Sequence, residues 1–95
     1  MGKKDDYERE LQARLDEFSA EIERLKERAD KAEADAQPWH RKQIEALQEK
    51  HGLAKEKLDE LRESSDDAWE DMKVGIATAW DSVGNALKSA AKRFE

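Results

Sequence analysis

Residues 64–95 read SSDDAWEDMKVGIATAWDSVGNALKSAAKRFE, and this stretch decides the fold. Its large apolar side chains recur at steps of three or four residues, which is the spacing of one face of an α-helix. The steps keep an eleven-residue rhythm, which is typical of a straight or slightly right-handed coil. The stretch therefore predicts a long amphipathic helix with an apolar interaction face, whose large residues are Trp69, Met72, Ile76, Trp80, Val83, Leu87 and Phe94.

Both ends of this predicted helix carry residue types that favour a helix terminus. Ser64–Asp67 is the clearest boundary in the chain, because a serine at an N-cap accepts a hydrogen bond from a free backbone N–H and acids suit the positive end of a helix. The helix is predicted to start near Asp66. Lys88, Lys92 and Arg93 lie in its last turns, where the helix dipole favours positive charge.

The chain before this boundary, residues 1–63, repeats its apolar residues at alternating steps of three and four, which is the heptad signature of a coiled coil. Pro38 lacks an N–H and crowds the preceding turn, so the sequence predicts a kink or a break near Gln37. Gly52 keeps the heptad phase and is expected inside a helix, although His51 and Gly52 also fit a helix end and a turn. The predicted coiled-coil seam consists of Leu15, Phe18, Ile22, Leu25, Leu47, Leu58 and Leu61.

These patterns predict an all-α protein with two parts, residues 1–63 and residues 64–95. The segments are about 40–45 Å long as helices, and lengths this similar allow them to fold back on one another. An antiparallel coiled-coil hairpin and a three-helix bundle both fit. A chain of 95 residues without cysteine has a small core and no disulfides, so we expect an oligomer in either case.

Charged residues make up much of the chain, and their arrangement limits the classes of partner that the chain is expected to bind. Charged residues are 44% of the sequence and the net charge is -6, with acids and bases interleaved. No basic stripe exists to follow a phosphate backbone, so nucleic acid is not an expected partner. No window reaches the roughly 18 consecutive apolar residues of a membrane span, so a cytoplasmic location is expected.

Candidate chemical sites are weak. His40 and His51 point the same way on a helix, but the residues three positions before them are Gln37 and Gln48, which are poor metal ligands. The acids at residues 66–71 suit a helix start and lack an accompanying nucleophile or phosphate-binding loop. We therefore expect no catalytic residue, no metal, no cofactor and no small-molecule substrate.

The tryptophans point to an interaction role, because tryptophan is enriched at protein interfaces. We predict a non-enzymatic structural protein that self-associates through its seams, with the last helix completing the bundle or docking on a helical partner. The alternative is a protein that binds lipid surfaces or protects against stress through this helix, since Lys73 and Arg93 flank its apolar face. A membrane surface is the second choice because residues 64–95 carry net negative charge.

The stretch from Asp67 to Trp80, together with Ala90–Phe94, resembles the tails of small bacterial proteins described as coiled-coil domain proteins. Residues 15–18 and 22–26 extend this resemblance over most of the chain. The eleven-residue repeat is also similar to that of late-embryogenesis-abundant proteins and exchangeable apolipoproteins. The similarity of the repeat implies protective or lipid-surface roles, and neither resemblance supplies a catalytic residue.

Overall fold

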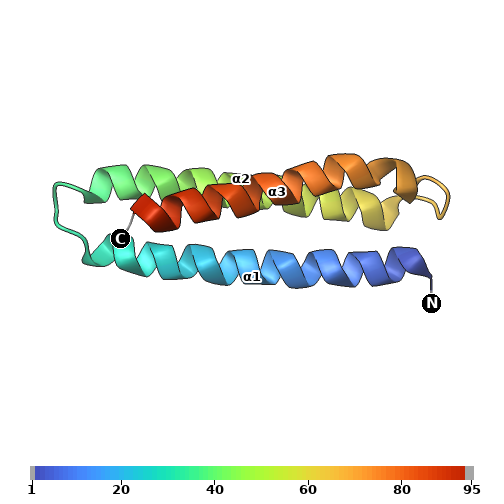
Figure 1. Ribbon diagram of the computed structural model, residues 1–95, viewed down its shortest axis with the longest axis horizontal. Helices are drawn as coiled ribbons and strands as arrows, with labels where there is room; N and C mark the ends of the chain where they lie inside the picture. The colour runs from blue at the N-terminus through green and yellow to red at the C-terminus, as the bar shows by residue number, and fades with distance from the viewer. Residues whose placement is uncertain (1, 94–95) are drawn as a thin grey trace.

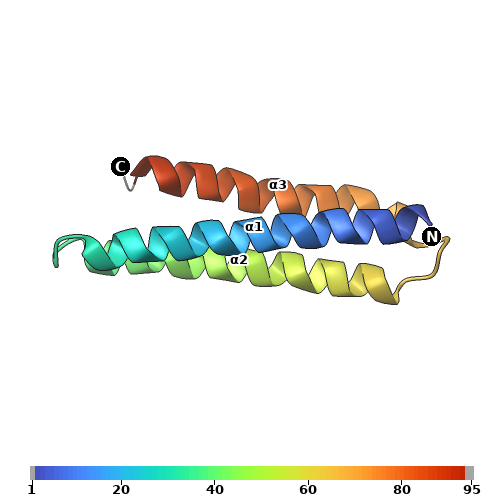
Figure 2. The same ribbon diagram turned by 90° about the horizontal axis from the view of Figure 1, so that it is seen from below.

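A computed structural model describes residues 2–93, which form three α-helices and no strand. α1 spans Lys3–Lys31, α2 spans Gln37–Glu63 and α3 spans Trp69–Arg93. The helices lie side by side in a rod of 51 × 19 × 18 Å, with α2 antiparallel to both α1 and α3 (Figures 1 and 2). The predicted all-α class is confirmed, and of the two arrangements expected, this chain has the three-helix bundle.

Two short loops with the same backbone geometry reverse the chain, at residues 32–36 and 64–68. Each preceding helix ends on one extended residue: Ala32 has φ -70° and ψ 161°, and Ser64 has φ -73° and ψ 156°. The residue after it, Glu33 or Ser65, accepts backbone hydrogen bonds from the residues three and four positions ahead. The same turn is therefore used twice, and it brings the three apolar stripes together.

Pro38 begins a helix instead of interrupting one. It lies in the first turn of α2, where a residue without an N–H removes no intrahelical hydrogen bond. Of the kink and the break that the sequence allowed near Gln37, the structure has a break, at residues 32–36. Gly52 lies inside α2, so no turn forms after His51.

Ser65 caps α3, but the helix begins later than expected, at Trp69 instead of near Asp66. The Ser65 hydroxyl oxygen accepts a hydrogen bond from the Ala68 N–H at 3.2 Å, and its carbonyl oxygen accepts one from the Trp69 N–H at 3.3 Å. Residues 66–68 form a turn around this cap, and the regular helix starts once the turn has closed.

One continuous core runs along the rod and buries apolar side chains from all three helices, which is the main source of stability for a fold of this kind. Two side-chain nitrogens that reach this core bond to backbone carbonyl oxygens of α1. Trp80 Nε1 donates to the Leu11 carbonyl oxygen at 3.3 Å, and His51 Nε2 donates to the Leu15 carbonyl oxygen at 3.1 Å. The buried residues are Leu11, Leu15, Ile22, Leu25, Ala29, Ile44, Leu47, Ala54, Leu58, Leu61, Trp69, Ile76, Trp80, Val83, Leu87 and Ala90.

Candidate interaction surface

The predicted seam and the predicted interaction face lie in this one core, where they pack together within a single chain. Phe18 of the seam and Met72 of the face are half-buried at its edge, and Phe94 lies outside the described residues. The other members are buried, namely Leu15, Ile22, Leu25, Leu47, Leu58 and Leu61 of the seam and Trp69, Ile76, Trp80, Val83 and Leu87 of the face. A surface for partners must therefore be sought on the outside of the bundle.

The side chains that the sequence offers as candidates for metal binding or catalysis have structural roles in the bundle. His51 bonds to a backbone carbonyl of α1, which occupies the ring nitrogen that faces the core. The acids Asp66 and Asp67 lie in the turn before α3, and Glu70 and Asp71 lie in its first turn, where the helix dipole stabilises negative charge. Residues 2–93 contain no group of three or more His, Asp or Glu side chains placed to hold a metal ion.

An aromatic cluster joins α1 to α3 near the N-terminus of each helix. The Tyr7 and Trp69 rings are 5.8 Å apart between centroids, and the Lys73 ammonium lies 4.3 Å from the Trp69 ring centre. Burial raises the pKa of Tyr7 above its ordinary value of 10.0; the carboxylate of Glu10 adds to this, and Arg14 opposes it. The cluster contributes cation–π and aromatic contacts that hold the two helices in register.

A groove lies between α1 and α3 farther along the rod, with a volume of about 470 Å³. Its apolar lining includes Phe18 from α1 and Leu87 and Ala91 from α3, and Gly84 adds no side chain to it. Charged residues of both helices, among them Glu21 and Lys88, form its rims. The groove is thus an apolar channel between charged edges, the arrangement that suits a helix with an apolar stripe.

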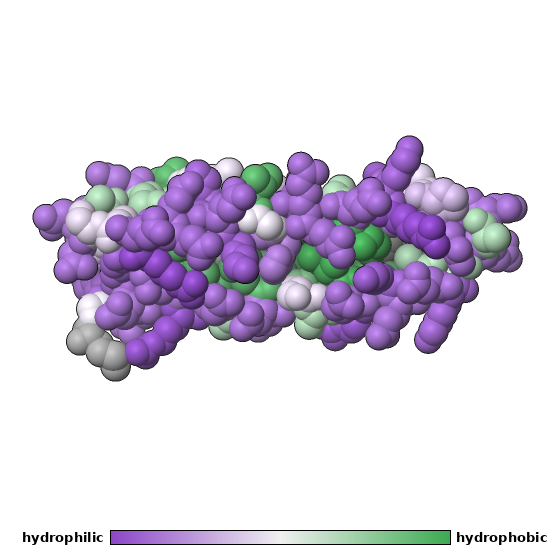
Figure 3. All heavy atoms as spheres, turned by 180° about the vertical axis from the view of Figure 1, so that it is seen from behind, coloured by the Kyte–Doolittle hydropathy of each residue, from purple (hydrophilic) through white to green (hydrophobic). Residues whose placement is uncertain are grey.

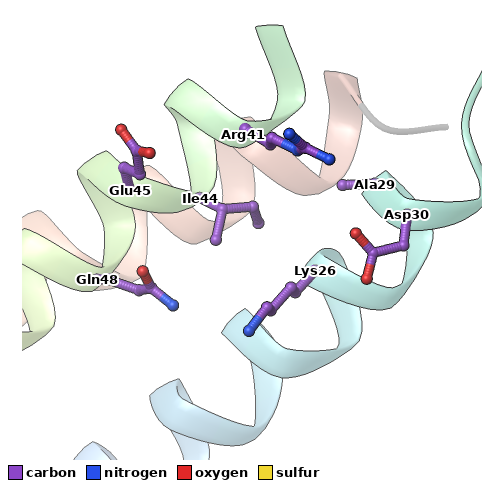
Figure 4. A pocket seen from close by; sticks show the side chains of 7 residues that line it. All are labelled: Lys26, Ala29, Asp30, Arg41, Ile44, Glu45 and Gln48. Carbon is purple, nitrogen blue, oxygen red and sulfur yellow. The ribbon is translucent and has the colours of Figure 1, made fainter. Parts of the chain in front are cut away.

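The opposite side of the bundle, where α2 lies nearest the viewer, is covered mainly by hydrophilic side chains, with apolar atoms visible along the middle and in a few places at the upper edge (Figure 3). A pocket of about 220 Å³ lies between α1 and α2 on the rod (Figure 4). Ile44 and Ala29 line its apolar part, while Lys26 and Asp30 on α1 and Arg41 on α2 surround it with both signs of charge. Such a pocket suits solvent better than an apolar partner.

Comparison of the sequence with family models found no match, and neither did comparison with curated proteins or with solved structures. The resemblances to coiled-coil domain proteins and to eleven-residue-repeat proteins therefore stay predictions. Within residues 2–93, no helix is both long enough and apolar enough to cross a membrane.

Proposed function

We propose that this chain is a non-enzymatic, cytoplasmic structural protein that binds another helix in the groove between α1 and α3. The observation that carries the proposal is the apolar lining of that groove, at Phe18, Leu87 and Ala91, on a surface otherwise rich in charge. Covering it would remove apolar area from water, which is favourable by about 25 cal/mol per Å². A fourth helix laid there would complete a four-helix arrangement, a common packing solution for amphipathic helices.

The topology of the bundle explains why a groove remains open between α1 and α3. α2 packs antiparallel against both of its neighbours. α1 and α3 run in the same direction, and the contact between them is less extensive than the contact of either helix with α2 (Figure 1). Phe18, which the heptad pattern places in the seam, consequently stays half-buried at the groove. Self-association through the predicted seams would require the helices to separate, so we place the contact on the outside of the folded bundle.

Binding to a lipid surface, by contrast, would require the bundle to open. The apolar face of α3, including Trp80 and Ile76, lies inside the core, and α3 would have to leave the bundle to present it to a membrane. Binding in the groove leaves the core closed and needs no such opening. The groove therefore supports helix binding better than lipid binding.

Photo-crosslinking inside cells tests the proposal. The exposed Ala20 at the groove is replaced by p-benzoylphenylalanine, and the exposed Ala46 on α2, which lies away from this groove, is replaced in a matched control. We expect irradiation to give a discrete protein adduct from position 20 and little from position 46, with the crosslinked peptide identified by mass spectrometry. Adducts of equal yield from both positions, or none from position 20, would contradict a groove that binds a helix.

A further inference from the structure

The topology of the bundle favours one direction for a helix bound in the groove. α1 and α3, which form the groove, run in the same direction, and α2 runs antiparallel to both (Figures 1 and 2). Parallel neighbours align their macrodipoles unfavourably, whereas antiparallel neighbours oppose them favourably. A fourth helix antiparallel to α1 and α3 would complete an up-down-up-down bundle, in which each helix is antiparallel to its two neighbours.

The charges on α1 change sign along the groove. Glu17 and Arg24 both line it and lie seven residues apart, with the acid nearer the N-terminus of α1. Glu10 precedes Glu17 by seven residues, and Lys31 follows Arg24 by seven. Seven residues are almost two helical turns, so these four exposed residues follow one side of α1. That side is acidic toward the start of α1 and basic toward its end.

α3 has the same order of charges on the facing wall of the groove. Lys88 lines the groove, and the exposed Asp81 lies seven residues before it on the same side of α3. The exposed Lys92 follows Lys88 by one helical turn. Because α1 and α3 are parallel, both walls are acidic toward the same end of the rod and basic toward the other.

Arg14 and Glu21 depart from this order, and both have contacts within α1. Arg14 is half-buried and lies over the Phe18 ring at 5.8 Å. Glu21 lines the groove and pairs with Arg24 at 2.6 Å, but both side chains are exposed, so the pair contributes little. A guanidinium has five N–H donors, so Arg24 can also bind a carboxylate of a partner.

We infer that the groove binds an amphipathic helix of another protein that runs antiparallel to α1 and α3, with acidic residues in its first turns and basic residues in its last. The inference rests on the proposed function and adds the direction and the charge order of the partner. In this direction the acidic start of the bound helix lies beside Arg24 and Lys88, and its basic end lies beside Glu17. The same order of charges suits the dipole of the bound helix itself.

A second folded copy of this chain does not offer such a helix, because the apolar stripes of its three helices lie in its own core. The large apolar side chains exposed within residues 2–93 are Trp39, Leu53 and Val74. None of them has another large apolar side chain three or four positions away, which is the spacing of a helical stripe. The outer faces of the bundle thus lack the stripe that the groove would bind.

Two labelled amphipathic peptides test the charge order. They share one composition and one apolar stripe, but one carries its acids in the first half and its bases in the second, and the other has the reverse order. In a fluorescence-anisotropy titration with the full chain, we expect the acid-first peptide to bind about tenfold more tightly, since several rim pairs change from attraction to repulsion. Equal affinities, or tighter binding of the base-first peptide, would overturn the inference.

Exchanging two charges of the groove provides the matched variant. Glu17→Arg with Arg24→Glu keeps the composition and the net charge, and both positions are exposed. The exchange should remove most of the preference for the acid-first peptide, and circular dichroism confirms that the variant is folded. A preference that stays tenfold would mean that these charges do not select the bound helix, contrary to the inference.

Disulfide trapping tests the direction, because the natural chain has no cysteine. Ala77 and Ala91 lie on the same side of α3, seven residues before and after Gly84, and are about 21 Å apart along the helix. An acid-first peptide with an N-terminal cysteine should link mainly to Ala91→Cys, and one with a C-terminal cysteine mainly to Ala77→Cys. The opposite pairing would show a parallel helix and overturn the inference.

The inference and the proposed function fail in distinguishable ways. If neither peptide binds at hundreds of micromolar and position 20 gives no adduct in cells, both fail. If position 20 gives an adduct with another protein but the peptides bind in the parallel direction, the inference alone fails. An adduct between two copies of this chain at position 20 overturns the partner inferred here and leaves helix binding in the groove intact.

Discussion

Replacing Trp80 by alanine should lower the free energy of unfolding by about 3–5 kcal/mol, the usual range for removing a large aromatic side chain from a core. Trp80 is 0% exposed, lies in the middle of α3 and donates a hydrogen bond to α1. A domain of this size has a total stability of about 5–15 kcal/mol, so the variant should be close to unfolding at room temperature. Urea denaturation followed by far-ultraviolet circular dichroism measures the change.

The chain supplies a matched control for this substitution. Trp39 is 41% exposed on α2, and its ring lies 5.8 Å from the Arg93 guanidinium carbon. Trp39→Ala removes the same atoms from the surface and should lower the free energy of unfolding by about 1 kcal/mol or less. Equal losses for the two variants would show that Trp80 does not lie in the core described here.

The second large effect is a gain in stability. Gly52 and Gly75 lie inside α2 and α3, are exposed, and have nothing within 4 Å of the position that a Cβ would occupy. Glycine in a helix interior is less favourable than alanine by about 1 kcal/mol, because it loses more backbone freedom on folding. The double variant Gly52→Ala/Gly75→Ala should therefore gain about 2 kcal/mol, or roughly 8–16 °C in melting temperature for a domain of this size.

Calorimetry of the two single variants provides the control for this prediction. The two positions lie on different helices and share no contact, so their effects should add. A loss of stability at either position would mean that another chain packs against that glycine, or that its helix is not continuous. Gly84 is left unchanged in this experiment because it lies in the groove between α1 and α3.

Much of the fold follows from the sequence by local rules. The three- and four-residue steps predict the helices, and the steric demands of Pro38 predict the interruption before α2. The sequence also predicts a serine cap within Ser64–Asp67, without choosing between the two serines, and only the turn at residues 66–68 separates the expected start of α3 from the observed one. Each of these features depends on residues within about one helical turn, which is why the sequence reveals them.

The grouping of the apolar stripes could not be predicted in the same way. Periodicity shows that Leu58 and Trp80 each belong to an apolar face, but it does not show that the two faces pack in one chain instead of between chains. That result depends on two reversals of the chain, at residues 32–36 and 64–68. The groove depends on the parallel pairing of α1 and α3, which only the complete bundle defines.

Gly84 is the sequence feature that comes nearest to indicating the groove. A glycine inside a regular helical repeat is unfavourable, and it often has a packing or functional reason.

The closed single-chain bundle is tested most directly by a distance measurement between spin labels at Glu33→Cys and Lys92→Cys. These positions lie in the loop after α1 and at the end of α3, at the same end of the rod (Figure 1). Labelled chain is mixed with excess unlabelled chain, so that pulsed electron resonance reports distances within one molecule. We expect one narrow distance, far shorter than the 51 Å length of the rod. A broad distribution, or a distance near or beyond that length, would show that α3 leaves the bundle or packs on another chain.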